Sequence, residues 1–401
     1  LDQLSDEAFG RSQISFLKDL KLHHDSRVIV SSLPDDSEVN PDTGQQYLYL
    51  CETRLKEWSV PRVSVTSATE VMEQSSVEAL SIVDQLLTFR NRTLTAPQRD
   101  VIAEAVSDQV EVNALYLTLI VLVASQWTSQ LSSSETLLAK QVRPLIGQLF
   151  DSLEHEFGDV LVQAAMGFIT FSAKGVSDVE MEDLMSLHDG VLDFVFQYAT
   201  PSIRRIPSHV WLRLRRRLVV MRLVVEREGG GLVWFHRQLR EVAEVRLKSW
   251  EKRVHLIMGD YFGNLISSGT QEQRKITLQG WTLQGSPYEE SAEVNKRRCE
   301  EASHHFLSAK LYSKLEAELC NLEGICCKLR CGESFQLILE LDALESAYAI
   351  GLSNGDGSDD KQLSFQRVNH FLRWLKQDVY MLKKSPIKNL LSSASLRKRQ
   401  Y

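Results

Sequence analysis

Residues 204–246 read RRIPSHVWLRLRRRLVVMRLVVEREGGGLVWFHRQLREVAEVR, and this stretch decides the fold. Its first part has apolar residues at helical spacing: Val210, Trp211, Leu214 and Leu218. Two short apolar runs, 221–225 and 232–235, then flank a turn with three consecutive glycines, which supply the positive φ angles that a tight hairpin needs. His236 follows, and a second helical segment comes after it. The order helix, hairpin, helix predicts a winged helix.

The arginines of this stretch allow two interpretations. They are Arg213, Arg215, Arg216, Arg217 and Arg222. Winged helices often bind DNA, and arginines would contact its phosphates. Alternatively, the arginines form a solvated helix face that pairs with acidic neighbours. The whole chain carries a formal net charge of −7, whereas DNA-binding domains are usually basic, so we expect no DNA binding.

The composition is that of an ordinary soluble globular protein. The chain has 401 residues, enough for two to four compact units, with 43% hydrophobic and 25% charged residues. Its cysteines form no CxxC pair and have no histidine at zinc-finger spacing. They are Cys51, Cys299, Cys320, Cys326, Cys327 and Cys331. We interpret them as reduced, largely buried thiols of a cytoplasmic protein, with a zinc site as the rival interpretation.

The chain shows neither a signal peptide nor a membrane span. It begins with Leu1 rather than Met, which leads us to expect a piece of a longer protein. The most apolar run, residues 114–124, is only about half of the ~20 residues that cross a bilayer. We therefore expect this run to form a buried helix.

The pattern along the chain predicts a mostly α protein with a partial α/β start. Residues 1–65 contain two strand-like runs, 27–32 and 62–65, separated by a helical piece, as at the end of an α/β domain. Helical patterns fill 66–147, with a helix start at Thr95-Ala96-Pro97-Gln98. In the next segment, 148–247, Ser177 and Glu180 have the spacing of a capping box. Residues 248–401 read as helical with polar interruptions at 267–274 and 354–361.

The order of these segments resembles the STAND-class NACHT ATPases, most closely the NACHT and WD-repeat family. LDQLSDE (1–7) looks like the end of a Walker B region, and RVIVSSLP (27–34) resembles the sensor-1 strand. NRTLTAPQ (91–98) and VNALYLTLIVLVASQW (112–127) look like helical domain 1. Residues 153–195 and 210–242 resemble the family's winged-helix domain, and 304–386 are similar to the helical connector before its repeats.

This resemblance implies four parts: the C-terminal end of a P-loop NTPase core in 1–65, helical domain 1 in 66–147, a winged-helix domain in 148–247 and a helical connector in 248–401. It also assigns roles to single residues. In such proteins a winged-helix histidine contacts the phosphates of ADP in the closed state, and the matching residue is His236. Without the resemblance, a lone histidine between strand and helix would be read as structural.

The remaining assignments concern the nucleotide and its metal. Asp2 matches the second acidic position of an extended Walker B, where a carboxylate orients water or magnesium; it could equally cap a helix. Ser31 and Ser32 occupy the end of the sensor-1 strand, where many NACHT proteins carry an arginine that senses the γ-phosphate. Ala114 stands where the family has a proline, beside Leu115 and near the adenine, which implies a looser adenine contact.

The sequence contains no G-x-x-x-x-G-K-[ST] phosphate loop, so we expect this chain alone not to hydrolyse ATP. The resemblance implies a parent protein that binds ADP or ATP with Mg²⁺, associates with itself when open, and binds protein partners through C-terminal repeats. It leaves open whether this parent protein is a slow ATPase. A scaffold that no longer binds nucleotide is the alternative function, and a DNA-binding winged helix is the third.

Overall fold

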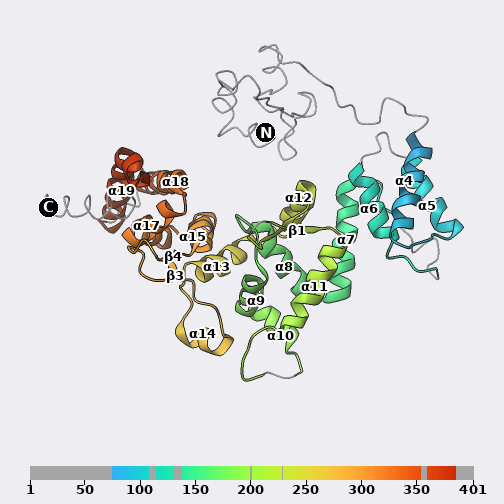
Figure 1. The fold of residues 1–401 in the computed structure, drawn as a ribbon, viewed down its shortest axis with the longest axis horizontal. Helices are drawn as coiled ribbons and strands as arrows, with labels where there is room; N and C mark the ends of the chain where they lie inside the picture. The colour runs from blue at the N-terminus through green and yellow to red at the C-terminus, as the bar shows by residue number, and fades with distance from the viewer. Residues whose placement is uncertain are drawn as a thin grey trace, which may run out of the picture. The chain divides into compact units, whose positions relative to one another are not determined.

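The computed structural model describes residues 75–107, 114–129, 138–198, 201–227, 229–353 and 359–384. Contacts divide the chain into two units, Leu1–Met72 and Glu73–Tyr401, and all described residues belong to the second. These residues form sixteen helices and four short strands, so the predicted mostly α class is confirmed for them (Figure 1). The expected α/β start, 1–65, lies outside the described residues.

The first group of helices contains three elements: α4 (Ser75–Phe89), α5 (Ala96–Ser107) and α6 (Ala114–Ala124). The helix start predicted at Thr95 is confirmed, because the Thr95 N–H donates to the Gln98 side-chain oxygen at 3.1 Å. The apolar run 114–124 forms α6, and seven of its eleven residues are buried. It packs against α4 and α7, as the prediction of a buried helix requires.

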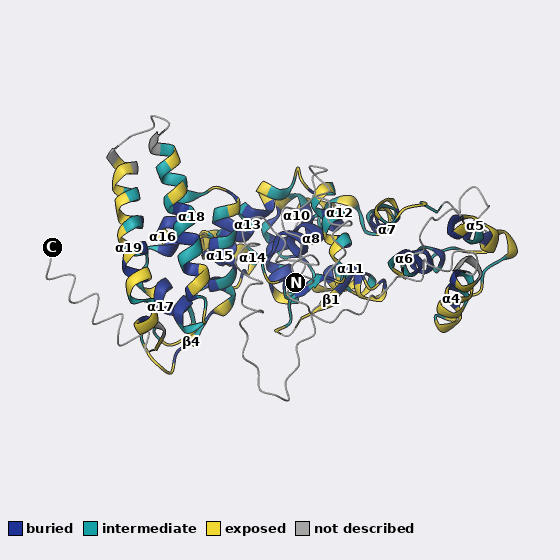
Figure 2. Ribbon diagram, turned by 90° about the horizontal axis from the view of Figure 1, so that it is seen from above, coloured by how far each residue is buried: buried dark blue, intermediate teal, exposed yellow. Residues whose placement is uncertain are grey.

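The second group surrounds one nearly fully buried helix. Its helices are α7 (Val142–Phe157), α8 (Asp159–Phe171), α9 (Asp178–Leu187), α10 (Asp189–Val195), α11 (Ser208–Val220) and α12 (Arg237–Arg246). Ten of the thirteen residues of α8 are buried, and α7, α9, α10 and α12 all contact it. Figure 2 shows α8 in the colour of buried residues. The capping box at the start of α9 is confirmed, with both Ser177 and Glu180 hydrogen bonds present.

The predicted hairpin is also confirmed. Strands β1 (Val224–Glu226) and β2 (Leu232–Trp234) pair antiparallel, with Val224 opposite Trp234. The turn uses Gly229 and Gly230 at φ values of 99° and 82°, which glycine adopts without strain. Helix α11 precedes the hairpin and buries Trp211, Leu214 and Leu218, as its spacing predicts.

The third group begins with α13 (Glu251–Phe262), which packs on both α8 and α15. The other helices are α14 (Ser268–Arg274), α15 (Lys296–Ser308), α16 (Tyr312–Leu319), α17 (Leu322–Arg330), α18 (Ser334–Ser353) and α19 (Asp359–Lys384). The interpretation of 267–274 as an interruption is wrong. This segment is helix α14, which Ser267 caps by accepting the Thr270 N–H. None of its residues is buried, so no apolar period marked it.

A second small hairpin interrupts the helices of this group. Strands β3 (Thr282–Gln284) and β4 (Glu293–Val294) pair antiparallel, where we had expected only helix. Because the two strands are two and three residues long, they offer no alternating pattern for the sequence to reveal. Residues 354–358 of the second expected interruption lie outside the described residues, and α19 begins at Asp359.

One buried apolar cluster runs through all three groups, from Ala79 to Leu382. Among the described helices, none is long and apolar enough to cross a bilayer.

Five of the six cysteines are described, and all five are free thiols. Cys299, Cys326 and Cys327 are buried, in agreement with the reduced-thiol interpretation, and burial raises the pKa of Cys327 to about 12. Cys51 lies outside the described residues.

Candidate functional site

His236 occupies the position predicted for it, between strand β2 and helix α12. Its backbone is extended, with φ −134° and ψ 144°, and it is the N-cap of α12. The Nδ1 atom accepts a hydrogen bond from the backbone N–H of Gln238 at 3.2 Å. The side chain is half-buried. His236 therefore has a structural role at the helix entrance, because a side-chain acceptor satisfies one of the free N–H groups there.

This hydrogen bond also determines which nitrogen carries the proton. Because Nδ1 uses its lone pair as an acceptor, the neutral imidazole must hold its proton on Nε2. An Nε2–H group is a donor that a phosphate oxygen can accept. The capping role and a phosphate-binding role are thus compatible, since they use different nitrogens of one ring.

The structure says less about the other residues that we expect to contact the nucleotide. Ala114 is exposed at the start of α6, and Leu115 is half-buried against the core. A cleft of about 380 Å³ lies at the other end of α6 and includes neither Ala114 nor Leu115. It is lined by residues 91–95, Gln98, Ala124 and 127–129. Asp2, Ser31 and Ser32 lie outside the described residues.

Two arginines of α11, Arg215 and Arg217, have acidic partners. Arg215 pairs with Asp178 at 2.7 Å and with Glu226 at 3.0 Å, and Arg217 pairs with Glu156 at 3.0 Å. Arg213 lies 5.9 Å from the centroid of the Phe157 ring. Arg216 and Arg222 are exposed. These pairs agree with the interpretation of the arginines as a solvated face with acidic neighbours.

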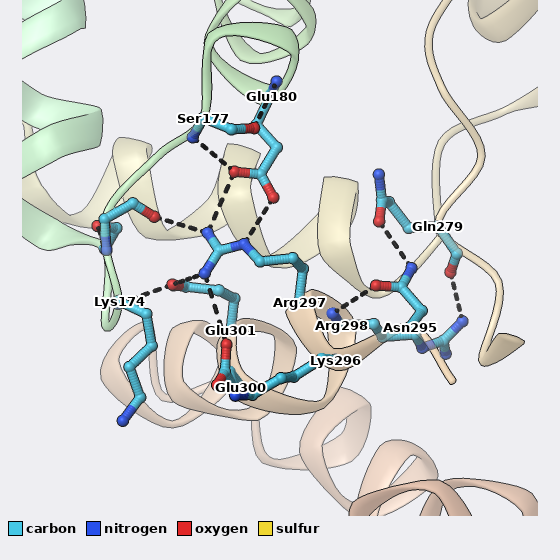
Figure 3. Close-up of polar contacts among 12 residues, drawn as sticks. Lys174, Ser177, Glu180, Gln279, Asn295, Lys296, Arg297, Arg298, Glu300 and Glu301 are labelled. Carbon is cyan, nitrogen blue, oxygen red and sulfur yellow. Dashed lines mark hydrogen bonds and ion pairs between the residues drawn. The ribbon is translucent and has the colours of Figure 1, made fainter. Parts of the chain in front are cut away.

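A polar junction, which sequence reasoning missed, joins the second and third groups of helices (Figure 3). Arg297 of α15 donates to both carboxylate oxygens of Glu180, at 2.7 and 3.2 Å, and to the Gly175 carbonyl oxygen at 2.6 Å. It also pairs with Glu301 at 3.1 Å. Burial alone would lower the pKa of Arg297, but the hydrogen bond to Glu180 and the surrounding carboxylates raise it. Arg297 thus holds the capping-box loop onto α15.

Glu301 is fully buried beside this arginine and is also well satisfied. Its carboxylate accepts the backbone N–H groups of Ala173 at 2.9 Å and Lys174 at 2.8 Å. His305 contributes a further contact at 3.2 Å. Burial would raise the pKa of Glu301, but the hydrogen bond from His305, the Arg297 charge and the loop N–H groups hold it at about 2. The carboxylate is therefore ionised at neutral pH.

A second ion pair lies next to the junction, within the third group, between α15 and α16. Arg298 donates two nearly parallel hydrogen bonds to Glu318, at 3.0 and 2.9 Å, and its guanidinium lies 3.9 Å from the centroid of the Trp281 ring. Its third donor reaches the Gln279 carbonyl oxygen at 2.8 Å. In the sequence KRRCEEASHH (296–305), Arg297 and Glu301 have the i, i+4 spacing of a helical ion pair. This spacing is the local sequence feature that indicates part of the junction. The partners across the junction leave no such local signal.

Comparison with known proteins identifies relatives. No family model matches the chain, and no solved structure matches it. The chain is 30% identical over 302 residues to the NACHT domain- and WD repeat-containing protein 1 of Mus musculus, which covers 71% of this chain. It is 29% identical over 195 residues to the NACHT and WD repeat domain-containing protein 2 of the same organism, covering 47% of this chain.

The matched segments span only 18% and 11% of those two relatives. The human NACHT domain- and WD repeat-containing protein 1 matches similarly, at 29% identity over 273 residues and 17% of its length. The sequence similarity to curated members of the NACHT and WD-repeat family thus agrees with the resemblance that the order of the segments indicated. The chain is a homologue of the NACHT and WD repeat-containing proteins, over a segment that spans less than a fifth of their length.

Proposed function

We propose that this chain is part of a nucleotide-switched signalling scaffold, closed with ADP and open with ATP, that associates with itself and recruits protein partners. The homology to NACHT and WD repeat proteins supports this proposal. The observation that carries it is the geometry of His236, whose Nδ1 caps α12 and whose Nε2–H remains the donor for a phosphate. We place the protein in the cytoplasm on the grounds of its free thiols.

The proposed mechanism is a shift between two populations. In the closed state ADP lies between the nucleotide-binding core and the winged helix, and His236 donates to its phosphate. A hydrogen bond to a charged group contributes about 1.5–3 kcal/mol, which favours the closed state by roughly 10- to 150-fold. Exchange for ATP moves the winged helix away and removes this contact. This opening then exposes surfaces for oligomerisation.

The remaining nucleotide contacts follow from the same family assignment. We propose that Asp2 orients water or the Mg²⁺ ion, that Ser31 and Ser32 lie near the γ-phosphate without an arginine sensor, and that Ala114 and Leu115 lie near the adenine. A phosphate loop would have to come from outside this chain, because its sequence has none. Partners would bind WD repeats, which the names of the relatives include.

The test is the nucleotide content of the protein to which this chain belongs, prepared at its full natural length. After denaturation we expect about one ADP per chain. The informative variant is His236→Asn, because asparagine keeps an N-cap acceptor for α12 but provides no Nε2–H at the same reach. We expect it to release at least ~10-fold less ADP, in line with a lost hydrogen bond to charge. The control is His209→Asn, which alters an exposed histidine of α11.

Each result decides between the hypotheses. If wild type, His236→Asn and His209→Asn release equal amounts of ADP, the nucleotide-switch hypothesis stands. The role of His236 is then only to cap α12. No nucleotide in any of them, with an oligomeric state that ignores ADP and ATP, would refute the switch and leave a nucleotide-independent interaction scaffold. A DNA-binding function requires retention of DNA at low salt, where phosphate contacts are strongest; we expect none.

A further inference from the structure

Three histidines form a cluster between α13 and α15, beside the end of α8. His255 comes from α13, and His304 and His305 come from α15. His255 is 4% exposed and His305 is fully buried, while His304 is half-buried. Each of the three rings offers one nitrogen, and these three atoms all lie within 4.8 Å of one another. Three histidines this close and this buried are unusual, since histidine is a residue of intermediate burial.

The hydrogen bonds of two of these rings determine their protonation. The Nε2–H of His305 donates to the Glu301 carboxylate at 3.2 Å, and the Nε2–H of His304 donates to the Phe171 carbonyl oxygen at 3.3 Å. In the neutral rings this leaves the lone pair on Nδ1 in both cases. The Nδ1 atoms of His255 and His305 are 2.8 Å apart, so His255 supplies the proton between them.

This arrangement is the one that metal-binding histidines adopt. A ligating histidine donates its other ring N–H to a carboxylate or a backbone carbonyl, which fixes the tautomer and orients the ring. Glu301 and Phe171 provide these two acceptors. Two aromatic rings also lie against the cluster: the Phe262 ring is parallel to His305 at 6.2 Å, and the Phe171 ring lies 5.5 Å from His255.

We propose that His255, His304 and His305 bind one divalent transition metal ion through their imidazole nitrogens, with zinc as the expected occupant. Imidazole is a preferred ligand of Zn²⁺, and three protein ligands leave a fourth tetrahedral position for water. Nitrogens at 2.0–2.1 Å from one ion are roughly 3.3 Å apart, so the cluster has to contract by no more than about 1.5 Å at its widest.

Binding requires one proton to move within the cluster. His255 Nδ1 gives up its proton and takes one at Nε2, so that each of the three rings can offer one lone pair to the ion and no net proton is released. The ion then replaces a single N–H···N hydrogen bond by three coordinate bonds between α13 and α15. The site consists of residues of α13 and α15 and includes neither His236 nor the hairpin, so its test is independent of the proposed nucleotide switch.

The test is metal content of the 401-residue chain, prepared without a polyhistidine tag and equilibrated with equimolar zinc. We expect about one zinc per chain, and the cobalt-loaded protein should show the intense visible absorption of tetrahedral nitrogen-coordinated Co²⁺. His255→Gln and the half-buried His304→Gln should both lower the affinity at least ~10-fold and abolish this absorption. The controls His209→Gln and His370→Gln alter exposed histidines and should bind like the wild type.

A second measurement distinguishes a loss of zinc binding from misfolding of a variant. Zinc should raise the Tm of the wild type and of both controls, since a ligand that binds only the folded state stabilises it. It should not raise the Tm of His304→Gln, which circular dichroism must show to be helical. Wild-type protein that retains no stoichiometric zinc and shows no Tm rise overturns the proposal, as does equal zinc binding by the cluster variants and the controls.

Discussion

His188 is a buried histidine that must stay neutral. It is 1% exposed, caps α10 by accepting the Val191 N–H at Nδ1, and stacks on the Trp250 ring at 5.2 Å. Burial and, to a smaller extent, the charge of Arg253 together lower its pKa from the usual 6.5 to about 4. Because the folded pKa lies below the unfolded one, the unfolded chain takes up the proton first. The stability that neutral His188 provides is complete above pH 6.5 and is lost as pH falls towards about 4.

We therefore expect His188→Asn to remove part of the acid sensitivity. Between pH 7 and 5 the wild type should lose about 2 kcal/mol more free energy of unfolding than the variant, because His188 contributes one proton to the linkage. Asparagine keeps an N-cap acceptor for α10. Urea unfolding at both pH values measures the difference. The same acid loss in the variant would contradict the assignment.

Lys328 is the most deeply buried cation among the described residues whose burial is given. It is 1% exposed and donates to Glu340 at 3.0 Å, to Ser303 at 2.8 Å and to the Cys299 carbonyl oxygen at 2.7 Å. We expect Lys328→Met to lower the free energy of unfolding by about 3–5 kcal/mol, since it leaves the Glu340 charge buried without its partner.

An exposed ion pair supplies the control for this prediction. Lys376 and Asp342 pair at 2.6 Å, but their side chains are 49% and 41% exposed. Lys376→Met should therefore cost less than about 1 kcal/mol. The double variant Lys328→Met/Glu340→Gln should recover much of the lost stability. Equal effects of the two single lysine variants in denaturant unfolding would rule out the buried pair as the cause.

At the scale of elements, α13 and α15 approach closely because α13 carries glycine at the crossing. A Cβ atom on Gly259 would lie 2.9 Å from the buried Phe306 ring. We expect Gly259→Ala to lower the free energy of unfolding by about 1–3 kcal/mol, the usual effect of overpacking. Gly147, inside α7, has nothing within 4 Å of its would-be Cβ. Gly147→Ala should instead raise stability by up to about 1 kcal/mol, because alanine favours helix.

Thermal unfolding of both variants measures this contrast. A destabilised Gly147→Ala, or a stabilised Gly259→Ala, would contradict the packing argument. The contrast separates helix propensity, which is the same for both substitutions, from the close approach, which Gly259 has and Gly147 does not.

Sequence predicted the elements whose signals are local. The capping box of Ser177 and Glu180, the glycine turn at 229–231 and the apolar stripe of α11 each lie within a few residues, and the structure confirms all three. Helix α14 was missed because it buries nothing and so has no apolar period. The hairpin of β3 and β4 was missed because its strands are too short to alternate.

The candidate site divides in the same way. The position of His236 could be predicted, because a strand, a histidine and a helix follow one another directly in sequence. The junction could not be predicted, because Arg297 and Glu180 are 117 residues apart. The local sequence around either residue does not indicate its partner. The same holds for His255 and His305, which are 50 residues apart. Periodicity shows which face of a helix is buried, but not what covers it.

At the scale of the whole molecule, Arg297 joins two groups of helices that are distant in sequence. We expect Arg297→Gln to lower the free energy of unfolding by about 3 kcal/mol, because Glu301 would lose the cation that compensates its burial. Hydrogen exchange should quicken in residues 172–180 and 296–306, where the broken bonds lie. It should stay unchanged in α18 and α19.

The neighbouring residue offers a matched control for this variant. Lys296 is 65% exposed at its side chain and pairs only distantly with Glu300, at 3.5 Å. Lys296→Gln should leave hydrogen exchange in both segments as in the wild type, since exposed pairs contribute little. Quickened exchange in both variants, or in neither, would contradict a specific role of Arg297.

The bond between Ala173 and Glu301 has a consequence for synthesis on the ribosome. The two residues are 128 positions apart, so at about 5–20 residues per second the carboxylate emerges on the order of 6–25 s after the loop. Until then the Ala173 and Lys174 N–H groups lack this acceptor. The face of α8 that packs on Val254 is uncovered for a shorter time, until α13 is made. The nascent chain thus presents an apolar helix for seconds, long enough for a chaperone to bind it.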